Sequence, residues 1–246
     1  MSRPFPRPPK RSILSRLTPL FLIPLFFFLS GCVYLRLLDV KRQLADFDRH
    51  FSIEGKSDLV IRFKKPVLFA RDTRFLIGAD RLSQSKDGRE VVWRYEFESV
   101  KSSPVPKAPM EELSLRLHFL ENLLTRIVVP ETFLRLFHRE VLVETLKQAA
   151  NAEVLALKKT ARVGVKLPPD VEALLPAREK VLNLMGPPLE LKEEDGLQTL
   201  IYQYRMIKDK NRVPIIAFFG FSNDGLLRRM RVKWDTATVD MHFVRE

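Results

Sequence analysis

The sequence predicts an α+β fold of two layers, in which helices lie on antiparallel β-meander sheets. Three observations predict this class. Several segments alternate apolar and polar residues, which is typical of antiparallel strands with one buried face. An amphipathic helix pattern follows Pro130, and a shorter one begins near Pro176. Asn223-Asp224-Gly225 is a strong hairpin signal between two such strands. Helices combined with runs of strands are typical of layered α+β folds.

The start of the chain has the pattern of an export signal. Five basic residues and no acidic residue precede an apolar run over residues 17–29. This length fits the core of a signal peptide and is shorter than the about 20 apolar residues of a bilayer span. The alternative is an uncleaved anchor over residues 17–35, which carry no charge, although Pro19 and Pro24 argue against one long helix.

The apolar run ends in Leu29-Ser30-Gly31-Cys32. This motif resembles the lipobox of bacterial lipoproteins, in which an aliphatic residue and two small residues precede a cysteine. The resemblance implies a signal peptide over residues 1–31, cleavage between Gly31 and Cys32, and attachment to the membrane through lipid on Cys32. The alternative is an ordinary buried thiol, but Cys32 is the only cysteine of the chain and stands where a lipobox requires it.

The exported part is weakly basic and has no second cysteine. The formal net charge is +12, and about +7 remains once the signal is removed. Such a balance suggests nucleic acid in a cytoplasmic protein, but an exported protein meets anionic lipid headgroups instead, so we expect no nucleic-acid partner. The fold must rest on its apolar core because no intramolecular disulfide can form. By resemblance to enteric-type lipoproteins, Val33 in place of an aspartate implies the outer membrane, facing the periplasm.

After the signal, the sequence predicts a tether and two modules. Residues 32–50 form a lipidated helical tether that either lies on the membrane or packs back on the domain. Residues 51–165 form an N-terminal α+β module, and residues 166–246 form a C-terminal module. Period-two patterns predict strands at residues 59–67, 93–98 and 113–119, and further strands are predicted at residues 124–129, 197–206, 215–221 and 226–234. Apolar stripes predict helices at residues 130–149 and 176–185, with a proline-rich loop at residues 167–170.

Residues 176–232 carry a family resemblance. A helix pattern ends at Met185-Gly186-Pro187, an aromatic strand contains Tyr202-Gln203-Tyr204, and Phe221 precedes the turn that ends at Gly225. This order resembles the BamE or SmpA/OmlA-like domain, found in the small lipoprotein of the outer-membrane β-barrel assembly machinery. The resemblance implies a helix C-cap at Gly186 and a positive-φ turn at Gly225.

The first half of the chain contains a similar pattern, which indicates two related modules of the BamE-like kind. Gly78 precedes Gly88 by ten residues, and Gly186 precedes Gly196 by the same ten. An aromatic strand follows the second glycine in both cases. The alternative is that any two β-meanders with a glycine turn look alike.

Signatures of catalysis are missing from the sequence. The four histidines are dispersed, and no glycine-rich phosphate loop or nucleophile elbow occurs. His138, Glu140 and Glu144 on the predicted long helix could suggest a metal site, but a solvated helix face is the simpler explanation. We therefore expect no enzyme activity, no cofactor and no metal.

One cluster of basic residues suggests binding. Arg229, Arg231 and Lys233 share one face of the strand at residues 226–234. They form either a contact for acidic headgroups or acidic protein edges, or a water-facing strand whose charges prevent aggregation. The neighbouring strand at residues 215–221 is apolar on both faces, which fits a central strand or one that meets another protein.

The sequence thus favours a non-enzymatic, lipid-anchored envelope protein that docks onto other envelope proteins, in outer-membrane assembly or maintenance. The alternative is a carrier or sensor that holds a lipid or another small ligand between helices and sheet. A hydrolase would require a cluster of serine, histidine and acid that the sequence does not show.

Overall fold

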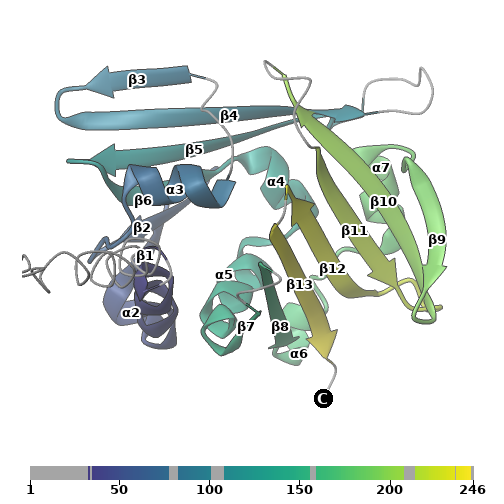
Figure 1. Ribbon diagram of the computed structural model, residues 1–246. Helices are drawn as coiled ribbons and strands as arrows, with labels where there is room; N and C mark the ends of the chain where they lie inside the picture. Colours follow the sequence, from purple (N-terminus) through teal and green to yellow (C-terminus); the bar gives the residue numbers. More distant parts are fainter. Residues whose placement is uncertain are drawn as a thin grey trace, which may run out of the picture.

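The computed structural model describes residue 33 and residues 35–77, 83–100, 108–155, 159–207, 214–235 and 237–244 (Figure 1). Residues 35–45 form an N-terminal helix. The other helices are α2 (Phe47–His50), α3 (Ala70–Ile77), α4 (Glu131–Leu136), α5 (Arg139–Gln148), α6 (Pro169–Glu172) and α7 (Arg178–Met185). The strands are β1 (Phe51–Glu54), β2 (Leu59–Phe63), β3 (Ser83–Asp87), β4 (Glu90–Val100), β5 (Glu112–Leu120), β6 (Leu123–Val129), β7 (Glu153–Leu155), β8 (Thr160–Lys166), β9 (Glu190–Glu194), β10 (Leu197–Met206), β11 (Ile215–Phe221), β12 (Leu227–Trp234) and β13 (Ala237–Val244).

These strands form one mixed sheet. It has 13 strands in the order β1-β2-β6-β5-β4-β10-β11-β12-β13-β8-β7, with β3 paired to β4 and β9 paired to β10. Among the described strands, β8 and β13 pair in parallel and the other pairs are antiparallel. The helices are short and fill the hollow of this curved sheet or lie against its faces (Figure 1).

The predicted fold class, with helices layered on antiparallel β-meander sheets in two BamE-like modules, is wrong. The sheet is mixed and continuous, because β4 of the first half pairs with β10 of the second, from Phe97 opposite Met206 to Val100 opposite Gln203. The predicted boundary between residues 165 and 166 falls within β8, whose neighbours in the sheet are β7 and β13. Strand patterns in a sequence reveal the faces of a strand but not its partner, so they could not show that the two meanders join.

Within this one sheet, the order of elements occurs twice. In each half a helix is followed by a short hairpin, β1-β2 or β7-β8. The hairpin is followed by α3 in the first half and by α6 and α7 in the second. Four consecutive strands follow, β3 to β6 or β9 to β12, and each set pairs in chain order. The halves differ where β13 enters between β12 and β8, whereas β6 pairs directly with β2. Gly78, whose spacing to Gly88 matched that of Gly186 to Gly196 in the sequence, lies outside the described residues.

The helix predicted over residues 130–149 is broken in two. The chain is extended at Phe137 (φ −111°, ψ 123°) and His138 (φ −59°, ψ 149°), between α4 and α5. This break turns the side chain of Phe137 into the core, where its ring lies 5.6 Å from that of Phe133 and 6.4 Å from that of Phe219. Burial of the aromatic ring therefore outweighs the continuation of the helix.

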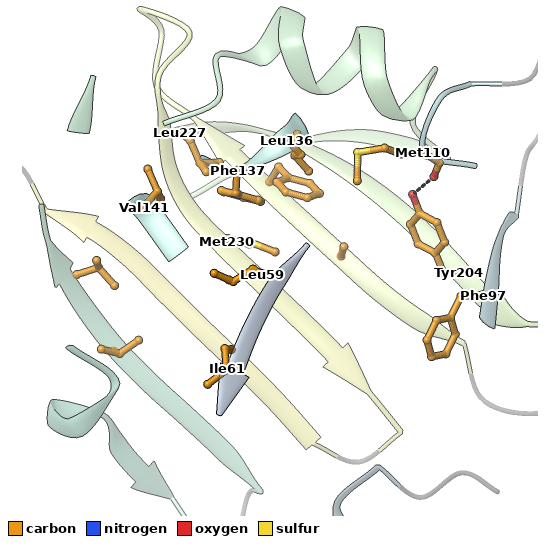
Figure 2. Close-up of a cluster of buried hydrophobic side chains, with 14 of the residues drawn as sticks. Leu59, Ile61, Phe97, Met110, Leu136, Phe137, Val141, Tyr204, Leu227 and Met230 are labelled. Atoms are coloured by element: carbon orange, nitrogen blue, oxygen red, sulfur yellow. Dashed lines mark hydrogen bonds between the residues drawn. The ribbon is translucent and has the colours of Figure 1, made fainter. Parts of the chain in front are cut away.

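A single apolar core lies inside the curve of the sheet. Leu59 and Ile61 of β2, Met230 of β12, and Phe137 and Val141 belong to one cluster of buried side chains (Figure 2). At the other end of the cluster, the hydroxyl of Tyr204 donates a hydrogen bond of 3.0 Å to the carbonyl oxygen of Met110. Strands from both halves of the chain contribute to this one core, so their stabilities are coupled.

The glycine that ends α7 has the positive φ that the sequence predicted. Gly186 has φ 77° and ψ −166°, so it is extended in ψ rather than left-handed helical. This combination lies in a region that glycine alone enters without strain. Gly225 also has a positive φ, of 78°, in the turn before β12.

Candidate membrane-attachment region and charged face

The predicted lipobox, Leu29-Ser30-Gly31-Cys32, lies outside the described residues. The described chain begins at Val33, directly after Cys32, and becomes a continuous helix from Leu35. The geometry around this helix therefore shows how the fold continues from the predicted attachment point.

The N-terminal helix is fixed to α3 by a buried ion pair. The guanidinium group of Arg36 donates to both carboxylate oxygens of Asp72, at 2.6 Å from Nε and 2.5 Å from Nη2. The side chain of Asp72 is completely buried, and that of Arg36 is 12% exposed. The backbone N–H of Phe69 donates to the same carboxylate at 2.8 Å, and the guanidinium of Arg36 lies over the Phe69 ring at 5.2 Å. A bidentate ion pair of this kind fixes both the position and the orientation of the N-terminal helix on α3.

Further contacts hold this helix along its length. Gln43 donates to the carbonyl oxygen of Lys65 at 3.0 Å, and Lys41 donates to that of Ala152 at 2.8 Å. In the adjoining α2, Phe47 is buried and stacks on a second phenylalanine, Phe51, with ring centres 5.1 Å apart. Of the two arrangements left open for the tether, the structure thus has the one in which the helix packs back on the domain.

The two arginines of the basic cluster on β12 are neutralised within the protein. Arg229 makes two hydrogen bonds of 2.8 Å to Asp240 of β13 and one of 2.8 Å to Asp195. Arg231 makes two to Glu194, at 2.8 and 2.9 Å. An acidic headgroup would have to displace these carboxylates. This geometry favours a structural role for the two arginines over the contact with an anionic surface that the sequence suggested.

Arg231 and Lys233 cover the ring of Phe218 on the outer face of β11. The guanidinium of Arg231 lies 4.2 Å from the centre of the Phe218 ring, and the ammonium of Lys233 lies 5.4 Å from it. The apolar outer face of this strand is thus covered within the chain, and β11 is a central strand between β10 and β12. Gly220 leaves space for the β9–β10 hairpin, since a Cβ atom there would lie 3.0 Å from the Leu197 side chain.

Asp240 is the most buried charge of this cluster. Its side chain is 4% exposed, with Arg229 on one side and the ring of His242 at 3.3 Å on another. Burial alone would raise the pKa of the Asp240 carboxyl, but the hydrogen bonds and charges of Arg229 and His242 outweigh burial and hold the pKa below its ordinary value. The same pair raises the pKa of Arg229. Asp240 is therefore charged at neutral pH and links β12 to β13.

The first half holds a polar cluster that the sequence did not predict. Glu90 accepts a hydrogen bond from Arg126 and lies 3.2 Å from His118. Burial acts to raise the pKa of Glu90, and its hydrogen bonds to Arg126 and His118 lower the pKa overall. His118 had no recognisable motif because its partners lie 28 residues before it and 8 after it. The cluster ties β4, β5 and β6 together on the outer face.

The candidate metal residues on the long helix are not brought together. Glu144 pairs with Lys147 at 2.8 Å instead, and His138 lies at the break before α5. No cluster of three or more histidine, cysteine, aspartate or glutamate side chains suited to a metal ion occurs in the described parts of the chain.

A shallow apolar pocket lies where the two halves meet. Its volume is about 220 Å³, and it is lined by Phe97, Leu113, Ser114, Leu115, Val129, Pro130, Phe133 and Ile215. These residues come from β4, β5, β6, α4 and β11. With almost no polar group in its wall, the pocket offers apolar contact without a means to orient a ligand.

No helix within the described ranges is both long enough and apolar enough to cross a bilayer. Comparisons of the chain with protein-family models, curated proteins and solved structures found no match.

Proposed function

We propose that this chain is a lipid-anchored, non-enzymatic envelope protein that serves as an interaction or scaffold component, with its lipid on Cys32. The observation that carries the proposal is the fixed start of the fold. The described helix begins at Leu35, three residues after Cys32, and Arg36 binds the buried Asp72.

The short spacer would keep the domain close to the bilayer. Three residues span at most about 11 Å even when fully extended. The helix that follows is fixed along its length to α3 and to the hairpin regions, so it cannot serve as a flexible arm. A protein attached in this way would present its remaining surface at a defined height and orientation, which suits docking onto neighbouring envelope proteins. Because Val33 follows the cysteine, we place the protein at the outer membrane, facing the periplasm.

Labelled fatty acid tests the anchor directly. Cells that express the chain should incorporate the label into it, and Cys32→Ser should abolish both incorporation and signal cleavage. Incorporation that persists in Cys32→Ser would refute the assignment. Crosslinking in intact cells, followed by identification of the crosslinked protein, then tests docking onto an envelope partner.

The second candidate function is a carrier or sensor of a small apolar ligand, and the pocket at the junction of the halves favours it. Its volume of about 220 Å³ is smaller than the roughly 300–1,000 Å³ of ordinary ligand sites, so a whole lipid does not fit. Because the pocket is so small, docking onto envelope proteins is better supported than a role as a ligand carrier. Native mass spectrometry of the purified protein distinguishes the two, because a carrier would retain a stoichiometric ligand.

A further inference from the structure

Two large apolar side chains are exposed near the start of the fold. Leu35, at the beginning of the N-terminal helix, is 60% exposed, and Phe75 of α3 is 66% exposed. The ion pair between Arg36 and Asp72 brings the helix start to α3. Asp72 and Phe75 are three residues apart on that helix and therefore lie on adjoining sides of it.

Basic side chains surround this apolar surface. Arg71 lies one helical turn before Phe75, and its side chain is 73% exposed. The ammonium group of Lys159, from the turn before β8, lies 5.9 Å from the Phe75 ring. The carboxylate of α3, Asp72, is buried and bound by Arg36, so it contributes little negative charge at this surface. We name Leu35, Arg71, Phe75 and Lys159 the anchor-side surface.

We propose that the anchor-side surface rests on the headgroups of an anionic bilayer, with Phe75 and Leu35 in the interface and Arg71 and Lys159 against lipid phosphates. This inference rests on the proposed function, because lipid on Cys32 would hold Leu35 close to the membrane. Exposed apolar and basic side chains together suit the boundary between headgroups and acyl chains. We name the bilayer as the partner of this surface because the proposed lipid on Cys32 would hold the two side by side.

A single fluorescent label tests the contact in the lipidated protein. Lipid blocks the thiol of Cys32, the only cysteine of the chain, so Phe75→Cys provides one reactive thiol for an environment-sensitive dye. The matched control is Leu191→Cys on β9, an apolar position with 57% exposure that lies on the far side of the molecule from α3 (Figure 1). Both proteins are reconstituted in vesicles of phosphatidylethanolamine and phosphatidylglycerol that contain a quencher on the lipid chains.

The expected result is a blue-shifted, quenched dye at position 75 and an unquenched dye at position 191. Adding Arg71→Glu and Lys159→Glu, or omitting phosphatidylglycerol, should reduce the quenching at position 75. A protein that floats with the vesicles but shows equal quenching at the two positions would overturn this inference and leave the proposed function standing. A protein that carries no lipid and does not float would remove both.

Discussion

Replacement of Gly186 by alanine tests whether backbone strain at the end of α7 matters for stability. Gly186 has φ 77° and ψ −166°, where a residue with a side chain is strained by about 1–3 kcal/mol. An added Cβ would also lie 3.2 Å from the Cβ of Ala108, closer than an ordinary contact. Alanine also reduces the conformational entropy of the unfolded chain, which offsets about 0.4–1 kcal/mol of this loss of stability. We therefore expect Gly186→Ala to lower the free energy of unfolding by about 2 kcal/mol.

Gly196 provides the matched control. It has φ 73° in the turn between β9 and β10, where the preceding Asp195 also has a positive φ, of 55°. Nothing lies within 4 Å of a Cβ built there, so the substitution adds no clash. The left-handed conformation costs about 1–2 kcal/mol, and after the gain from the unfolded state Gly196→Ala should cost about 1 kcal/mol or less.

Equilibrium urea unfolding of the lipid-free domain measures both variants. The slope of the transition should stay constant, so that the change in midpoint reports stability alone. Equal losses at the two glycines would refute the reasoning, since they would show that neither ψ at Gly186 nor the approach of Ala108 contributes. No loss at Gly186 would show that the end of α7 adapts to a side chain.

Three further predictions follow from the packing. A lipid-free domain starting at residue 33 should unfold cooperatively in urea, whereas one starting at residue 51 should be less stable by about 3 kcal/mol or more, because it loses the buried ring of Phe47. Arg36→Met should cost about 3–5 kcal/mol in urea unfolding, because the buried carboxylate of Asp72 would keep only the N–H of Phe69 and the more distant Arg71 at 4.0 Å. Adding Asp72→Leu removes the buried charge but also the bond to Phe69, so it should recover part of the loss. The pKa of Asp240 is lowered from 3.8. The contribution of its carboxylate to the free energy of unfolding should therefore be complete above that pH and be lost as the pH falls below it. In acid unfolding, the stability of Asp240→Asn should depend less on pH in this range than that of the unchanged protein.

The sequence predicted individual strands better than their assembly. The strands at residues 197–206 and 215–221 were predicted with the observed ends, and β12 begins one residue later than predicted. These segments have local signals, which are runs of apolar and aromatic residues and the turn at Asn223-Asp224-Gly225. The strand β13 was missed because Asp240 lies in its middle, where a carboxylate argues against burial. Arg229 on the neighbouring strand and His242 on the same strand make that position favourable.

The candidate site was less predictable than the fold. The sequence singled out Arg229 and Arg231 because like charges alternate along one strand, but it could not show the carboxylates that neutralise them from β9 and β13. The pair of Arg36 and Asp72 gave no signal at all, since its members are 36 residues apart. Each looks like an ordinary solvated charge until the two helices pack together.

The joining of the two halves has a physical cause in the lengths of the strands. In the described residues the hairpin partner β3 covers β4 from Glu90 to Arg94, and the hairpin partner β9 covers β10 from Leu197 to Ile201. The remaining half of each long strand would present unpaired backbone groups at an open edge. These two open segments pair with each other, from Phe97 opposite Met206 onward. Short hairpin partners therefore leave the free edges whose pairing makes one continuous sheet from what the sequence suggested were two.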